Sequence, residues 1–173
     1  MNIVKRNVKA RAVVNSSIER HPVPVLGVDY KVKIVYKNIK ITELDVENKT
    51  IKISLPNKYK KMSNKEILDL AIEKMYEQIA NVEIERAMEK TRIMLGFAPE
   101  DYKIEKLKND FGKCDGKNII IDPTVVMYKR EIIDYIVLHQ YCHLKYKTHA
   151  KGFYKMLEKY CPNYEKYEKV LNF

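Results

Sequence analysis

The sequence predicts an α+β fold, and three observations carry this prediction. Short segments of alternating apolar residues lie before and after a long segment with helical periodicity, without the regular alternation of a βαβ fold. The 173 residues are 46% hydrophobic with only 5 Gly and 6 Pro, which excludes collagen-like and largely disordered chains. No internal repeat is visible. We therefore expect one globular domain preceded by an extension.

Residues 1–27 show no strong pattern and form this N-terminal extension, whose structure the sequence leaves unassigned. The two prolines of His21–Pro24 indicate an extended or turning entry into the domain. Val13-Val14 are candidates for a sheet edge. The domain itself is expected to span residues 28–173.

Residues 28–56 predict three strands in an antiparallel β meander. Apolar residues alternate from Val28 to Tyr36, which is the period of a strand with one buried face. Polar turn residues then separate two further alternating runs. The predicted turns are Lys37-Asn38 and Glu47–Lys49. A strand beginning at Ile39 and Ile41 follows the first turn, and a strand with Ile51, Ile53 and Leu55 follows the second.

Residues 63–96 predict one long helix. Ser63 and Glu66 have the spacing of a capping box, in which each side chain bonds the other residue's backbone amide. Apolar residues recur at helical spacing until Gly96, a natural C-terminal stop. A stretch of about 30 residues exceeds most globular helices, so a break near Asn81 is an alternative.

Residues 100–173 predict a short hairpin followed by helices. One strand holds Tyr102–Leu107 and the other Asn118–Ile121, with a turn at Gly112–Gly116. Apolar spacing then predicts one helix from about Lys129 to Tyr146 and another over 153–160. A short terminal helix is expected after Pro162-Asn163.

Three of the four histidines lie within eleven residues, and this cluster is the most informative feature of the chain. His139 and His143 are four residues apart on a predicted helix, so their imidazoles project from one face at a distance that suits one zinc ion. His149 follows beyond the helix end, where the chain can fold back. Three protein ligands leave a fourth position for water, which is typical of a catalytic zinc site.

Gln140 stands at the position of the general base in the metallopeptidase motif H-E-x-x-H. An amide can hydrogen-bond a water molecule but cannot take up its proton. We therefore expect zinc binding to persist while hydrolysis falls by about 10²- to 10⁴-fold. Two explanations stay open: a naturally inactive relative, or a deliberate change of Glu to Gln.

The C-terminal motifs resemble the YgjP-like metal-dependent hydrolases, relatives of the SprT and WLM zinc proteases. The resemblance covers about residues 30–171. It rests on the segments Ile133–Leu144, His149–Tyr154, Tyr160–Tyr164, Phe111–Cys114 and Ile119–Asp122.

This resemblance implies a zincin-like fold, with a small twisted sheet and an active-site helix that carries the HxxxH motif. It implies zinc on His139, His143 and His149, and a metallopeptidase or other metal-dependent hydrolase activity. The strand Ile119-Ile120-Ile121 would border the cleft and pair with an extended substrate. The family's Trp, Arg and Ser are Phe111, Asp110 and Lys113 here, so we expect a diverged substrate side, and Lys113 would suit an anionic substrate.

The expected function is therefore a zinc-dependent, peptidase-like hydrolase with a peptide or other small substrate. Two alternatives remain: a nucleotide or phosphoanhydride hydrolase, and a non-catalytic metal-containing binding module. The net charge of +10 leaves nucleic acid as a weakly supported partner, because most lysines are interleaved with acids. The absence of a long apolar run and of a signal peptide, with three widely spaced Cys, predicts a cytoplasmic protein without a membrane partner.

Overall fold

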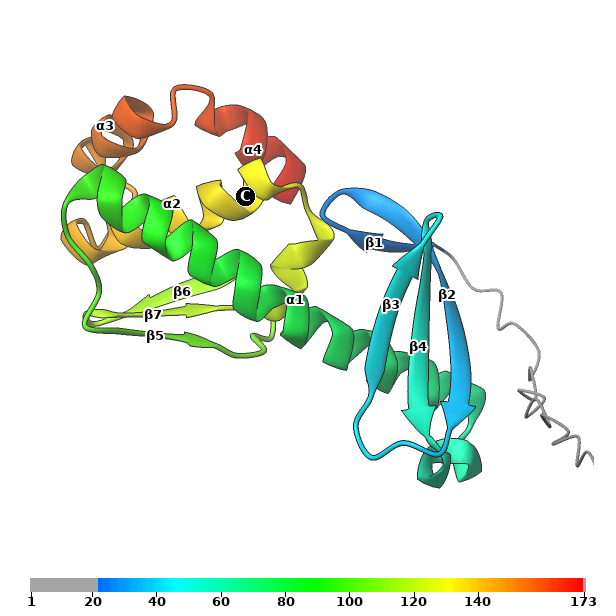
Figure 1. Cartoon of the computed structure of the whole chain (residues 1–173). Helices are drawn as coiled ribbons and strands as arrows, with labels where there is room; N and C mark the ends of the chain where they lie inside the picture. Colours follow the sequence, from blue (N-terminus) through cyan, green and yellow to red (C-terminus); the bar gives the residue numbers. More distant parts are fainter. Residues whose placement is uncertain (1–21, 173) are drawn as a thin grey trace, which may run out of the picture.

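The computed structural model describes residues 22–172, which form two lobes joined by one long helix (Figure 1). The N-terminal lobe (β1–β4 and η1) holds a four-stranded sheet, and the C-terminal lobe (β5 to α4) holds a three-stranded sheet and three α-helices. The candidate strand residues Val13-Val14 lie outside the described part. The bounds of the elements are β1 Val23–Val25, β2 Val28–Lys37, β3 Glu43–Glu47, β4 Thr50–Pro56, η1 Asn57–Lys61, α1 Asn64–Leu95, β5 Asp101–Ile104, β6 Gly112–Asp115, β7 Asn118–Ile121, η2 Pro123–Met127, α2 Arg130–Lys145, α3 Lys151–Tyr160 and α4 Tyr164–Leu171.

The N-terminal sheet is not the predicted antiparallel meander. Its order is β1-β2-β4-β3, and β4 lies between β2 and β3, parallel to β2 and antiparallel to β3. The reason is apolar content: β4 buries Ile51, Ile53 and Leu55, whereas β3 is charged at every second position. A charged strand suits a sheet edge, and the most apolar strand is buried in the middle.

The β3–β4 turn lies where the sequence predicts it, but β3 begins later than expected. Asn48 and Lys49 have φ values of 48° and 58°, the left-handed pair of a tight two-residue hairpin turn. The strand starts at Glu43, not at Ile39, and Ile41 is 76% exposed. Residues 38–42 connect β2 to β3 across the position that β4 occupies between them.

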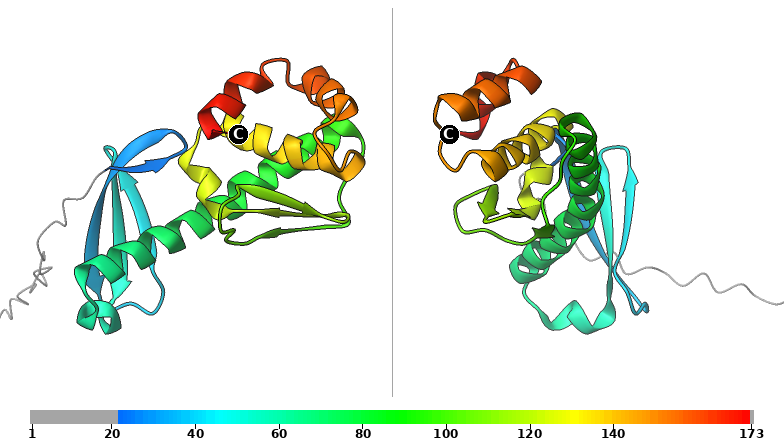
Figure 2. Two further views of the ribbon diagram at one scale, coloured as in Figure 1. Left: turned by 180° about the vertical axis from the view of Figure 1, so that it is seen from behind. Right: turned by 90° about the vertical axis from the view of Figure 1, so that its left-hand side faces the viewer.

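The long helix α1 is confirmed as one continuous element without a break at Asn81. The backbone amide of Ser63 donates to Glu66, and the amide of Glu66 donates to the Ser63 hydroxyl, so the capping box is complete. Gly96 ends the helix in the left-handed conformation, with φ 74°. Figure 2 shows that the first part of α1 covers the N-terminal sheet and the last part packs in the C-terminal lobe.

The C-terminal sheet has the order β5-β7-β6, which differs from a simple hairpin of two strands. The segment predicted as a turn, Gly112–Gly116, is mostly strand β6, and the turn is confined to Gly116-Lys117. β5 pairs with β7 in parallel, and β6 pairs with β7 antiparallel. As a result β6 is an edge strand beside α2.

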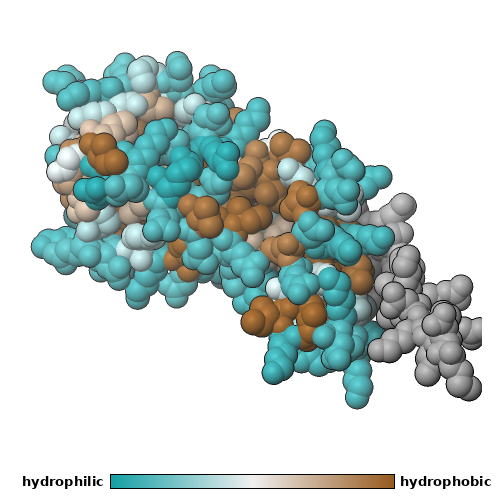
Figure 3. Space-filling model, viewed as in Figure 1, coloured by the Kyte–Doolittle hydropathy of each residue, from teal (hydrophilic) through white to brown (hydrophobic). Residues whose placement is uncertain are grey.

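Backbone hydrogen bonds between the turn after β1 and η2 join the two lobes. The turn after β1 donates backbone hydrogen bonds from Leu26 and Gly27 to the carbonyls of Val126 and Met127 in η2. On the face shown in Figure 3, hydrophobic side chains gather near the middle of the molecule while hydrophilic ones cover most of the rest. The residues 23–27 that the sequence left unassigned thus join the fold.

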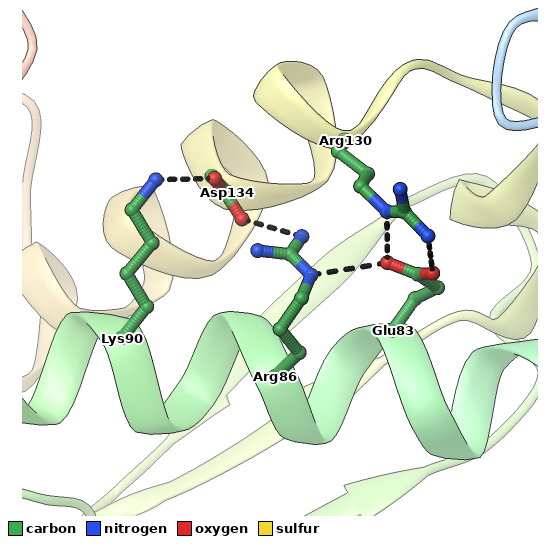
Figure 4. Close-up of polar contacts among 5 residues, drawn as sticks. All are labelled: Glu83, Arg86, Lys90, Arg130 and Asp134. Carbon is green, nitrogen blue, oxygen red and sulfur yellow. Dashed lines mark hydrogen bonds and ion pairs between the residues drawn. The ribbon is translucent and has the colours of Figure 1, made fainter.

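Charged side chains form ion pairs between α1 and α2 (Figure 4). Glu83 of α1 is 5% exposed and accepts hydrogen bonds from Arg130, with a 2.8 Å contact from its Nε, and from Arg86 at 3.0 Å. Arg86 and Lys90 both reach Asp134 of α2, at 2.7 and 2.6 Å. This network fixes the helix that carries the histidines.

Within the described part of the chain, no helix combines the length and apolar content that a bilayer crossing requires.

Candidate metal centre

Helix α2 places two of the predicted ligands one turn apart in the interior of the C-terminal lobe. Its residues Ile132, Ile133 and Tyr135–Cys142 are buried, as the apolar pattern of the segment predicts. His139 is 6% exposed, and His143 near the helix end is half-buried. The helix ends at Lys145, so the following residues are free to turn back toward its face.

The loop between α2 and α3 brings the third histidine to the other two. A Cβ atom added to Gly152 would lie 2.7 Å from the Tyr146 ring, so only a glycine lets α3 start this close to the loop. His149 precedes α3 and points back to α2. Its Nε2 atom lies 3.0 Å from the Nε2 atoms of both His139 and His143.

The three side chains form one cluster, and their candidate ligand atoms all lie within 4.8 Å of one another. Ligand nitrogens on a tetrahedral zinc ion, at about 2.0–2.1 Å from the metal, are roughly 3.3 Å apart. The cluster therefore has the size of a single-metal site. The predicted ligands His139, His143 and His149 are brought together as the sequence indicated.

The outer ring nitrogens of two histidines have hydrogen-bond partners. The Nδ1 atom of His143 lies 3.0 Å from the backbone carbonyl of Tyr146, which can only accept, so Nδ1 carries the proton and Nε2 offers its lone pair to the cluster. The Nδ1 atom of His139 lies 3.1 Å from the Tyr135 hydroxyl. That hydroxyl is also 3.2 Å from Glu168 of α4. Metal-binding histidines are typically held in this way by their second nitrogen.

Phe153 of α3 forms the floor of the cluster. The ring is fully buried, and its centroid lies 4.9, 4.7 and 4.7 Å from the rings of His139, His143 and His149. An aromatic floor restricts the rotation of all three imidazoles. It also removes water from one side of the site, so that solvent approaches from the exposed side near His149.

Burial keeps the His139 imidazole neutral. Loss of solvent lowers the pKa of His139 to about 3, and the neighbouring His143 and His149 lower it further. Burial likewise lowers the pKa of His143. A neutral imidazole is the form that binds a metal. Burial next to Glu168 raises the pKa of Tyr135 far above its usual value, so the phenol keeps its proton.

Gln140, which follows the ligand His139 in the sequence, packs against the edge strand β6. It is 5% exposed, and a Cβ atom on Gly112 would lie only 3.0 Å from its Cγ and Nε2 atoms. Gly112 belongs to the Phe111–Cys114 motif, and its missing side chain leaves the space that Gln140 fills. The residue at the base position is therefore held next to the backbone of β6.

The expectation for the substrate-side strand needs correction. Ile119–Ile121 form β7, the central strand, whose two edges are already paired with β5 and β6. Ile119 and Ile121 are fully buried, so this strand does not offer an edge to a substrate. The strand beside α2 with an unpaired edge is β6. Lys113 lies on it, exposed, with its amine 3.7 Å from Asp115.

Sequence reasoning missed the residues that support the ligands. Tyr135 has the i, i+4 spacing to His139 that puts both on one helix face, so this partner was accessible from the sequence. Glu168, Gly112 and the Tyr146 carbonyl carry no comparable local signal. Their roles depend on how α4, β6 and the loop pack around α2.

The donor set fits one metal ion of the kind that imidazole nitrogen prefers. Three imidazole side chains place their ligand atoms within 4.8 Å of one another, two outer nitrogens are oriented by partners, and one side is open. Imidazole suits Zn, Cu, Fe and Ni, and a three-ligand open site is typical of catalytic zinc. The cluster thus indicates one metal ion per chain.

Comparison with known proteins gives a family and two related structures. No curated protein sequence matches the chain. The metallopeptidase zymogen abylysin of Pyrococcus abyssi is 26% identical, with a TM-score of 0.47 over 51% of this chain and 90% of that chain. The metallopeptidase zymogen jannalysin of Methanocaldococcus jannaschii is 22% identical, with a TM-score of 0.46 over 52% of this chain and 88% of that chain.

The family model described as YgjP-like, metallopeptidase domain matches residues 2–173. This agrees with the resemblance seen in the C-terminal motifs. It also agrees with the α+β, zincin-like architecture, in which a helix with an HxxxH pair and a third histidine stand beside a small sheet. The chain belongs to the YgjP-like metallopeptidase family.

Proposed function

We propose that the protein is a zinc-dependent peptidase-like hydrolase in which Gln140 restricts catalysis. The observation that carries this proposal is the convergence of three Nε2 atoms, with 3.0 Å contacts, where the loop before α3 meets the face of α2. Zinc held by His139, His143 and His149 would supply Lewis-acid polarisation of a carbonyl and an activated water.

Strand β6 is the candidate for substrate binding. Its free edge runs beside α2, and an extended peptide pairing with Gly112–Asp115 would form main-chain hydrogen bonds as an added strand. Gln140 lies against the first residue of this strand. A peptide bound there would present its carbonyl groups to the region between Gln140 and the three histidines.

Gln140 can orient water or a substrate amide, but it cannot act as a proton acceptor. Its oxygen accepts and its nitrogen donates hydrogen bonds, and neither is basic near neutral pH. A glutamate at this position would take the proton released on attack of water and pass it to the leaving amine. We therefore expect the chain to bind metal and substrate with strongly reduced turnover.

The distribution of charge favours a peptide over an anionic substrate. Residues 66–173 hold 18 Lys and Arg against 18 Asp and Glu, whereas residues 1–65 hold 15 against 5. The part of the chain that builds the site thus has no excess positive charge, and Lys113 lies near Asp115. This speaks against a nucleotide or phosphoanhydride substrate, which would need a locally positive cleft.

The test combines metal analysis with restoration of the base. Protein purified without chelator or His tag should contain near one zinc per chain, and His149→Ala should lower that content. Gln140→Glu should then raise peptide hydrolysis at unchanged zinc content, with Gln78→Glu on the surface of α1 as the matched control. Hydrolysis of nucleotides but not peptides by Gln140→Glu would replace the peptidase assignment, and absence of bound metal would remove it.

A further inference from the structure

Helix α4 reaches the metal centre through one tyrosine. The Tyr135 hydroxyl lies 3.2 Å from a carboxylate oxygen of Glu168 and 3.1 Å from Nδ1 of His139. Tyr135 is 1% exposed and its ring packs against the tilted ring of Tyr167 of α4, with centroids 5.5 Å apart. The hydroxyl is therefore held between a carboxylate and an imidazole, away from bulk water.

The chemistry of the three groups fixes the direction of both hydrogen bonds. An ionised carboxylate only accepts hydrogen bonds, and a phenol has one proton to donate. The Tyr135 proton therefore points to Glu168, and the tyrosine oxygen is left as an acceptor. His139 must then donate its Nδ1–H to that oxygen, and its Nε2 carries the lone pair that faces His149 at 3.0 Å.

We propose that Tyr135 and Glu168 are positioning residues that hold His139 in its metal-binding tautomer. We call this pair the relay, because it connects α4 to the ligand His139. Through it the C-terminal helix supports the site. His143 needs no such relay because the Tyr146 carbonyl already accepts from its Nδ1 atom. The proposal rests on the three-histidine site but not on the reaction that the site performs.

Without the relay, the tautomer of His139 would not be fixed. Water near the tyrosine would let His139 exchange tautomers, and the opposite tautomer would put a proton on the Nε2 atom that faces the cluster. A neutral phenol alone can donate or accept, so it cannot select the tautomer by itself. Glu168 removes that ambiguity because it accepts the only proton that the phenol offers.

Two measurements test this proposal. The first is the nitrogen-15 NMR spectrum of the imidazoles in the metal-free protein, which distinguishes Nδ1–H from Nε2–H. His139 should be Nδ1-protonated in the unchanged chain, and Tyr135→Phe and Glu168→Gln should each produce a mixture of tautomers. The second is the zinc Kd, measured by competition with a chromophoric chelator, which should rise by about 10- to 100-fold in each variant.

Matched controls separate positioning from general stability. Tyr141 is also 1% exposed on α2, and its hydroxyl donates to the Met88 carbonyl at 3.2 Å, away from the histidines. Tyr141→Phe should lower the melting temperature without changing the tautomer or the zinc Kd. Glu165→Gln on the exposed side of α4 should change none of these.

The double variant Tyr135→Phe with Glu168→Gln gives the sharpest outcome. Since Glu168 acts only through Tyr135, the double variant should bind zinc no more weakly than Tyr135→Phe alone. Additive losses, or an unchanged His139 tautomer in both single variants, would overturn the relay. Failure of Gln140→Glu to hydrolyse peptides would contradict the proposed function alone, because the tautomer is read without metal or substrate.

Discussion

Removing the charge of Glu83 should loosen the attachment of the histidine helix to α1. Glu83 is nearly buried and accepts from Arg130 and Arg86, so Glu83→Gln converts charge-assisted hydrogen bonds into weaker ones (Figure 4). Breaking a buried ion pair costs about 3–5 kcal/mol when the remaining charge stays buried. Here the side chains of Arg86 and Arg130 are 35% and 59% exposed, so water solvates them in the variant.

We therefore expect a loss of about 2 kcal/mol at pH 7, the size of a hydrogen bond to a charged group. For a chain of this length this corresponds to a decrease of about 4–8 °C in Tm. Urea denaturation and thermal melting of the unchanged chain and of Glu83→Gln measure both quantities. Glu85→Gln, on the exposed side of the same helix, is the control and should stay within about 0.5 kcal/mol.

The same variant makes a prediction about pH. The hydrogen bond from Arg130 lowers the pKa of Glu83, burial opposes this, and Arg86 lowers the pKa further. A carboxyl whose pKa is lower in the folded state stabilises the protein above its unfolded value of about 4.3, and the stabilisation is lost as the pH falls through the folded value. The stability difference between the unchanged chain and Glu83→Gln should therefore shrink as the pH falls from neutrality to below the unfolded pKa of about 4.3. A difference that stays constant over this range, or that is below about 0.5 kcal/mol at pH 7, would refute the reasoning.

Three further changes probe the site. Phe153→Ala removes the buried floor under the histidines and should destabilise the chain by about 3–5 kcal/mol in urea denaturation, with a rise in zinc Kd; a loss below 1 kcal/mol would argue against a packed floor. Gly112→Ala should displace the side chain at position 140 and, in a Gln140→Glu background, lower kcat while the zinc Kd stays the same; equal kcat with and without the methyl group would contradict this contact. Zinc at about 1,000 times its Kd should stabilise the fold by about 4 kcal/mol, reversed by chelator, in thermal melts; no shift in Tm would show that the histidines do not bind zinc in the folded state.

The features that the sequence predicted correctly are those specified by neighbours along the chain. A capping box, helical periodicity and a terminal glycine define α1 from Ser63 to Gly96, because helix hydrogen bonds and caps join residues three or four apart. The spacing of His139 and His143 places two ligands on one helix face for the same reason. These interactions are local, so the order of residues is sufficient to predict them.

Strand neighbours were decided by tertiary structure. The sequence predicted a meander over 28–56, but β4 pairs in parallel with β2 because its apolar face is needed in the middle of the sheet over α1. In the second sheet β7 occupies the centre, and this leaves β6 as the open edge beside Gln140. Alternation shows that a segment is a strand, but it does not say which strand pairs with it.

The finer structure of the metal centre also depends on contacts between distant segments. His149 was a candidate from its proximity in sequence, but its 3.0 Å contacts with the other two histidines require the loop that Gly152 permits. Glu168 lies 33 residues from Tyr135 and meets it only because α4 packs on α2. The sequence by itself thus determined the ligand types and the helix that carries two of them. Tertiary packing determined the orientation of those ligands. A hydrogen bond between two helices joins residues far apart in the chain, so no sequence periodicity predicts it.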